Sequence, residues 1–277
     1  MNIGESANDT SPLPNGYVGK RTYLLGLLII LGCAYSQYVT KWPGLVVGIL
    51  VVYGMPLLAV KMLWNRSVTR KSLSYSNRAL KLGMAWFGIL TLVGTIASAL
   101  VLFMLLELDP SALNLLHRPN PVLHLPADLA WAMVAVSLLV IGPAEEGLFR
   151  GFVFRGLLGF FRANQWLSAA LLSSVIFAAA HLCYAVVYGI ASLVQFTDLV
   201  AFGMAMAWAY RLSGGNLLIP AMIHGTYDAT GFIGVATTPE IGAGLRLTMI
   251  ALGVSAAVAV FVPRLARKRG GGSQVEL

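Results

Sequence analysis

The stretch LAWAMVAVSLLVIGPAEEGLFRGFVFRGLLGF, residues 129–160, decides the fold of this chain. It is almost entirely apolar, and it is longer than the roughly 20 residues that a helix needs to cross a membrane. Its centre nevertheless carries two adjacent carboxylates, Glu145 and Glu146, followed by Arg150. An ionisable residue inside a membrane span costs roughly 2.5–3.5 kcal/mol on insertion scales, so such residues are expected inside the bundle and at functional sites.

The composition of the whole chain supports a membrane protein. The 277 residues are 58% hydrophobic and 11% charged, and the mean hydropathy is +0.78. A soluble domain is about 25% charged, so we expect an all-α, polytopic integral membrane helical bundle. About eight apolar runs are long enough to form spans. They cover roughly 23–39, 44–64, 83–106, 129–160, 166–190, 191–210, 216–236 and 241–262.

Lysine and arginine gather on one side of the predicted bundle, in the connections 65–82, 161–165 and 211–215 and in the C-terminal tail. The connection 107–128 on the other side holds a single arginine against three acidic residues. Because cytoplasmic connections are enriched in Lys and Arg, both termini are predicted to be cytoplasmic. The net charge of +8 belongs to this pattern, so membrane lipid rather than nucleic acid is the expected partner.

No polar stretch is long enough for a second domain. The predicted organisation is therefore a disordered cytoplasmic tail over 1–20, one transmembrane bundle over 21–263 and a basic cytoplasmic tail over 264–277. Cys33 and Cys183 lie in apolar runs, without the spacing of a metal site or a disulfide framework, and are expected to be packing residues.

The remaining intramembrane ionisable residues suggest a shared site. Glu145 and His181 lie equally far from a predicted turn near residue 163, so an antiparallel helix pair brings them level. His224 and Asp228 are four residues apart and therefore share one helix face. In a low-dielectric site, a carboxylate can act as a general base on water. An imidazole beside it can donate a hydrogen bond to a developing oxyanion. The set fits hydrolysis of an amide or ester inside the membrane.

Glu146 and Arg150 are also four residues apart, and we expect them to form a buried pair on one face of their helix. Glu145 points in another direction around the helix axis, because successive helical residues are rotated by about 100° about that axis. It has no counter-charge on its own helix. The two glutamates are therefore predicted to have different tasks. Asp198 lies outside these pairs and is expected to have a packing or hydrogen-bonding role.

Three short motifs, EEGLFR (145–150), FAAAH (177–181) and HGTYD (224–228), resemble a known pattern. They are similar to the E-E-x-x-x-R, F-x-x-x-H and H-x-x-x-[N/D] motifs of the CAAX prenyl protease type II family. That family also includes bacteriocin-processing and immunity-associated membrane proteases. The resemblance covers about residues 127–235, the expected catalytic core, and implies a glutamate-dependent intramembrane protease of about eight helices.

The resemblance implies a role for each matched residue. Glu145 would activate water with help from His181, while His224 and Asp228 would stabilise the oxyanion. The prenyl-processing members carry Asn where this chain has Asp228, so orienting His224 is the alternative role for this carboxylate. The residues that would organise the site are Glu146, Arg150 and Phe177.

No cofactor is expected, and the sequence contains no H-E-x-x-H motif. Zinc held by Glu145, His181 and His224 is the alternative.

The predicted function is an intramembrane endopeptidase that cuts near the cytoplasmic face, in a prokaryotic plasma membrane. Its substrate would be a CAAX-like prenylated C-terminus or a membrane peptide precursor. The alternative is a non-catalytic membrane scaffold, immunity factor or transporter that retains the fold, and the oligomeric state is left open.

Overall fold

The computed structural model describes residues 19–39, 45–63, 77–111, 127–161, 165–182, 185 and 189–237, with 250–251, 253–258 and 260–261 near the C-terminus. These residues form helices and turns and contain no strand, which confirms the all-α fold class. The predictions for residues 1–18, 112–126 and 262–277 and for Cys183 lie outside the described residues.

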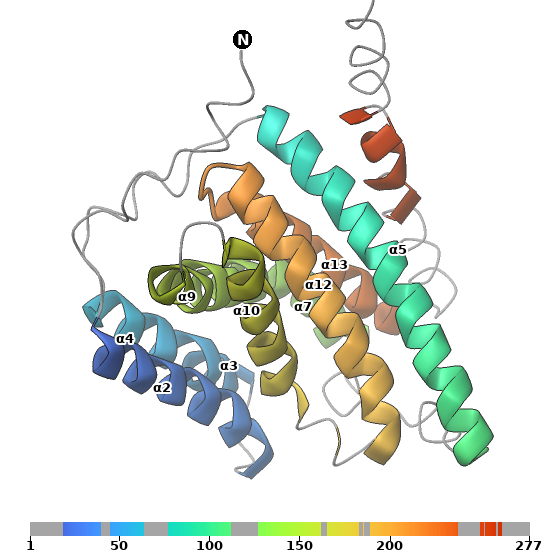
Figure 1. Cartoon of the computed structure of the whole chain (residues 1–277). Helices are drawn as coiled ribbons and strands as arrows, with labels where there is room; N and C mark the ends of the chain where they lie inside the picture. The colour runs from blue at the N-terminus through green and yellow to red at the C-terminus, as the bar shows by residue number, and fades with distance from the viewer. Residues whose placement is uncertain are drawn as a thin grey trace, which may run out of the picture.

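An N-terminal group of helices packs together on one side of the molecule, drawn in blue in Figure 1. It contains α2 (Lys20–Val39), followed by a helical segment that runs from residue 45 to residue 63. That segment is built from α3 (Leu45–Ile49), the π-helical turn η1 (Leu50–Gly54) and α4 (Met55–Leu63), and α2 contacts both η1 and α4.

Two long helices, α5 (Asn77–Leu108) and α12 (Ser192–Leu212), pack along each other on the other side of the bundle. Small residues allow this close approach: a Cβ atom added to Gly94 would lie 2.4 Å from the Cβ of Ala201. Helices in membranes commonly pack through such small residues, because their backbones can then approach closely. After a turn, α13 (Leu218–Ala236) follows α12 and packs against the centre of the bundle.

Residues 129–160 belong to one long helical run, from residue 127 to residue 160. It consists of α7 (Ala127–Val136), the π-helical η4 (Ser137–Ile141), α8 (Gly142–Glu146), the π-helical η5 (Gly147–Phe154) and α9 (Arg155–Phe160). π-Helical turns within α-helices occur frequently at functional sites. The two glutamates end α8, immediately before η5.

Side chains from neighbouring helices bond to backbone carbonyls of η5. The Tyr23 hydroxyl donates to the Val153 carbonyl at 3.0 Å, and the Ser173 hydroxyl donates to the Phe149 carbonyl at 3.3 Å. Buried carbonyl groups need such partners, because an unpaired one costs free energy comparable to a lost hydrogen bond. These bonds tie η5 to α2 and to α10 (Trp166–Ala180).

Among the described residues, three helices are long and apolar enough to cross a membrane: Leu80–Leu108, Leu129–Phe160 and Ser192–Leu212. The bundle of about eight spans and the cytoplasmic termini remain predictions. One predicted span needs correction, because α10 ends at Ala180 instead of continuing toward residue 190. The short 3-10 turn η8 (Gly189–Ala191) directly precedes α12.

Candidate active site

The end of α10 is held by side chains as well as by its own backbone. His181 caps the helix: its backbone N–H donates to the Ala178 carbonyl at 3.0 Å, and its ring Nδ1 lies 2.8 Å from the Phe177 carbonyl. The Tyr35 hydroxyl donates to the Ala179 carbonyl at 2.6 Å. The last carbonyls of a helix lack partners within the helix, and these contacts supply them. They account for the end of α10 inside an apolar run.

Glu146 is fully buried and holds two basic side chains. Its Oε1 accepts a hydrogen bond from Arg150 Nη1 at 3.1 Å, so the structure contains the predicted pair. The same oxygen lies 2.6 Å from Nδ1 of His224, a contact that the sequence did not predict. Arg150 is buried too, and its Nη2 donates to the carbonyl of Gly203 at 2.8 Å. Glu146 therefore links the long central run to α13, while Arg150 links it to α12.

Glu145 is also buried, but its two oxygens have different surroundings. Oε1 accepts a hydrogen bond from the Tyr53 hydroxyl at 3.0 Å. Oε2 has no hydrogen-bond partner among the described residues, and it lies 3.6 Å from Nε2 of His224. That distance is too long for a direct hydrogen bond. One oxygen of this carboxylate is thus fixed by the protein, and the other faces the imidazole across a gap.

Asp228 lies on the same face of α13 as His224, as the spacing predicted. Its Oδ2 is 3.4 Å from Nε2 of His224, and its side chain is 27% exposed, against 3% for that of His224. Nε2 of His224 therefore faces both Glu145 and Asp228, while Nδ1 is occupied by Glu146.

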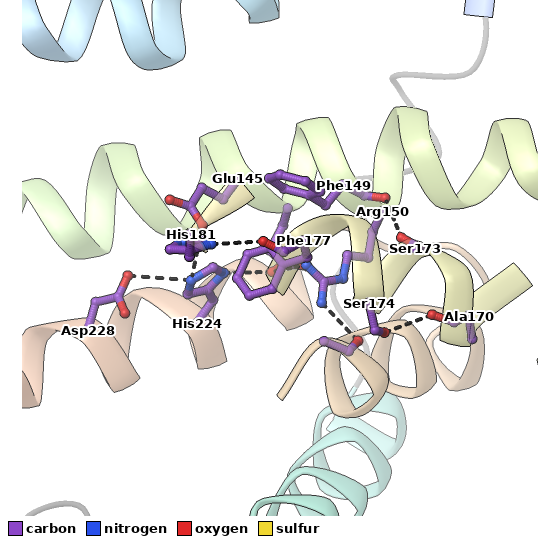
Figure 2. A network of polar contacts seen from close by, with 12 residues as sticks. Glu145, Phe149, Arg150, Ala170, Ser173, Ser174, Phe177, His181, His224 and Asp228 are labelled. Carbon is purple, nitrogen blue, oxygen red and sulfur yellow. Dashed lines mark hydrogen bonds and ion pairs between the residues drawn. The ribbon is translucent and has the colours of Figure 1, made fainter. Parts of the chain in front are cut away.

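The Phe177 ring packs against three basic side chains of the site. Its centroid lies 5.0 Å from the guanidinium carbon of Arg150, 4.8 Å from the ring centroid of His181 and 5.8 Å from that of His224. Both imidazoles therefore contact one buried aromatic side chain. Figure 2 shows Phe177 between Arg150 and the two histidines, with Glu145 and Asp228 beside them.

Two glycines let α13 come close enough to the central run for these contacts to form. A Cβ atom on Gly225 would lie 2.6 Å from the carbonyl oxygen of Ser137, and one on Gly142 would lie 2.5 Å from that of Ala221. Real Cβ atoms essentially never come so near. Gly225 directly follows His224, so its small size helps to place that imidazole beside Glu146.

The predicted catalytic and organising residues come from the central run, α10 and α13; His181 and Asp228 are partly exposed, and the others are buried. Asp198 is on α12, and its carboxylate accepts a long hydrogen bond, 3.5 Å, from Tyr227.

Within the described residues, no three His, Cys, Asp or Glu side chains are arranged to hold a metal ion. Zinc held by Glu145, His181 and His224 stays the alternative prediction.

Sequence reasoning missed Tyr53, which lies in η1 and hydrogen-bonds to Glu145. Tyr53 stands in an apolar run that carries no recognisable motif. The signal that could have found it is chemical: a tyrosine buried in a membrane helix needs a partner for its hydroxyl group.

Comparison with known protein families gave a match. Residues 127–230 match the family model described as "Type II CAAX prenyl endopeptidase Rce1-like", which confirms the resemblance drawn from the three motifs. Every predicted catalytic and organising residue lies inside the matched segment, whereas Tyr53 lies outside it. Neither the curated proteins nor the solved structures that were compared with the chain gave a match.

Proposed function

We propose that this chain, whose residues 127–230 carry a type II CAAX prenyl endopeptidase domain, hydrolyses a peptide bond within the membrane by means of Glu145. The family match implies a CAAX-type intramembrane protease. The assignment of the water-activating group to Glu145 rests on one observation: its Oε2 faces Nε2 of His224 without a hydrogen-bond partner among the described residues, whereas Glu146 already holds Arg150 and Nδ1 of His224.

A water molecule between Glu145 and the scissile carbonyl would lose a proton to Oε2 while its oxygen attacks the carbonyl carbon. The resulting tetrahedral intermediate carries the negative charge on the former carbonyl oxygen. When the intermediate collapses, the C–N bond breaks, and the proton held by Glu145 passes to the leaving amine. The carboxylate is then regenerated, so the cycle needs only water and the peptide.

His224 is the proposed donor to the oxyanion. A carboxylate can only accept, so the contact with Glu146 favours a proton on Nδ1. As an imidazolium, His224 also carries a proton on Nε2, the nitrogen that faces Glu145 and Asp228. Asp228 orients that ring rather than donating to the oxyanion, because an ionised carboxylate has no proton to donate.

His181 would assist Glu145. The Phe177 carbonyl can only accept, so a neutral His181 ring carries its proton on Nδ1. Its Nε2 is then a hydrogen-bond acceptor, able to orient the attacking water. The contacts of both imidazoles with Phe177 support a position for His181 on the same side of the site as His224.

The proposed substrate is a CAAX-like prenylated C-terminus or a membrane peptide precursor, cut near the cytoplasmic face of a prokaryotic plasma membrane. The family description, which names prenyl endopeptidases, supports the first substrate class. The basic connections along the chain support access from the cytoplasm.

The test uses purified protein in liposomes, with a peptide ending in a prenylated CAAX sequence and the same peptide without the prenyl group. Mass spectrometry identifies the cleaved bond. Glu145→Gln keeps an acceptor for Tyr53 but removes the base, so cleavage should fall by roughly 100-fold or more. Glu107→Gln changes an exposed glutamate at the end of α5 and serves as the matched control.

Wild-type rates in Glu145→Gln would contradict the mechanism. If wild-type protein cleaves neither peptide and releases no peptide from native membranes, the non-catalytic alternative is favoured.

A further inference from the structure

Three tyrosines of the N-terminal helices donate hydrogen bonds into the segment that matches the family. The Tyr23 hydroxyl bonds to the Val153 carbonyl at 3.0 Å, and the Tyr35 hydroxyl bonds to the Ala179 carbonyl at 2.6 Å. Both acceptors belong to the backbone. Tyr53 differs, because it bonds at 3.0 Å to the side chain of the proposed catalytic base. A part of the chain outside residues 127–230 therefore contacts the centre of the site.

The ring of Tyr53 is held by apolar packing. Tyr53 lies in the π-helical turn η1, which contacts α8, the element that ends with Glu145 and Glu146. Its partly buried ring packs against a small apolar cluster, formed by Met133, Ile141 and Phe232. The hydroxyl group is thus presented to Glu145 from a ring that the apolar cluster already holds.

This hydrogen bond distinguishes the two carboxylate oxygens. The terminal torsion of a glutamate is soft and has a broad distribution, so a carboxylate without partners can rotate. With Oε1 bonded to Tyr53, the plane of the group is held, and Oε2 is the oxygen that remains opposite His224. When a base is already held in one orientation, less free energy is needed to order it for reaction with water and substrate.

From these contacts we infer that Tyr53 is a positioning residue for Glu145, supplied by the N-terminal helices to a site whose other residues lie in the matched segment. The inference rests on the proposed function of Glu145 as the base. Because the Tyr53 hydroxyl bonds to the proposed base, its effect should appear in the rate of the chemical step rather than in the binding of substrate.

The kinetic test compares Tyr53→Phe with Tyr23→Phe in the liposome assay. Each variant loses one tyrosine hydroxyl and keeps the ring. We expect Tyr53→Phe to lower kcat by roughly 10-fold or more, with KM changed less than about twofold, because hydrogen bonds to charged groups are among the stronger ones. Tyr23→Phe should lower the melting temperature through loss of the bond to Val153 and leave kcat unchanged. An unchanged kcat in Tyr53→Phe, or a loss confined to KM, would overturn the positioning role.

A second measurement does not need catalysis. In a thermal double-mutant cycle in detergent, the melting-temperature shifts of Tyr53→Phe and Glu145→Ala should fail to add, because each substitution removes the same bond. The shifts of Tyr23→Phe and Glu145→Ala should add. Additive shifts for the first pair would overturn the inference even if the protease is active. Non-additive shifts in a protein that cleaves no substrate would instead overturn the proposed function and leave the contact standing.

Discussion

Nδ1 of His224 lies 2.6 Å from Oε1 of Glu146, although the two residues come from different helices, and their side chains are 3% and 0% exposed. The same carboxylate oxygen accepts a hydrogen bond from Arg150. Glu146 therefore provides negative charge for two buried basic groups. Its proposed task is to hold the site together, while the neighbouring Glu145 is the proposed base.

Replacing Glu146 by Gln should destabilise the whole protein. The change leaves the buried Arg150 guanidinium without its charged partner, and removal of one member of a buried ion pair costs about 3–5 kcal/mol. The measurement is thermal unfolding of the purified protein in detergent. Glu107→Gln, at an exposed glutamate, should leave the melting temperature unchanged. A melting temperature of Glu146→Gln equal to that of the wild type would contradict the proposed role of Glu146.

Replacing Gly225 by Ala should reduce activity by displacing α13. The added Cβ would lie 2.6 Å from the Ser137 carbonyl oxygen, so the helix must shift and carry His224 away from Glu146. Small displacements at a catalytic site can cost about 100-fold in rate. The comparison is with Gly32→Ala in α2, where nothing lies within 4 Å of the added atom. Equal kcat/KM in both variants would show that close packing of α13 is not needed.

Replacing Phe177 by Ala should impair both stability and activity. This fully buried ring contacts Arg150, His181 and His224, and a Phe→Ala change in a core costs about 3–5 kcal/mol. Phe177→Leu fills more of the space but lacks the aromatic face, so it should lose less stability than Phe177→Ala while still lowering kcat. Unfolding and cleavage are measured on the same samples. Phe103→Ala, at a residue that is 64% exposed, is the control, and a comparable loss there would argue against a special role for Phe177.

Replacing Asp228 by Asn tests its two possible roles directly. If Asp228 orients and balances the charge of His224 through the 3.4 Å contact, the amide should reduce kcat by about tenfold, or about 1.4 kcal/mol in the barrier. If the position serves as a donor to the oxyanion, the amide should increase kcat instead. We expect the decrease, and a variant faster than the wild type would reverse the assignment.

Chelators should leave the rate of cleavage unchanged. The described residues contain no group of three side chains arranged to hold a metal ion, and the proposed reaction uses only protein groups and water. The experiment preincubates the protein with EDTA or with 1,10-phenanthroline before the substrate is added. Loss of activity that is restored by added zinc would instead support the alternative set of Glu145, His181 and His224.

The sequence allowed several features to be predicted because they are local. The helical run that contains 129–160 follows from a long apolar stretch, and α12 and α13 begin and end within two residues of their predicted bounds. The i, i+4 spacings correctly placed Glu146 beside Arg150 and His224 beside Asp228. These relations depend on helix geometry alone, so no knowledge of tertiary packing was required.

The features that could not be predicted depend on contacts between distant segments. The apolar run continues past Ala180, and the end of α10 there involves the ring of His181 and the hydroxyl of Tyr35. The π-helical turns have no sequence signature of their own. The bond from Tyr53 to Glu145 joins residues 92 positions apart, and nothing in either local sequence indicates it.

The early end of α10 has a consequence for hydration. Its 15 residues span about 22 Å, less than the roughly 30 Å of a hydrocarbon layer, so α10 by itself is too short to cross that layer. Non-helical backbone at membrane depth is tolerated only where protein covers it or where it lines a water-filled space. A protease that works inside lipid needs water as a reactant, and the end of α10 is where we expect that water to gather.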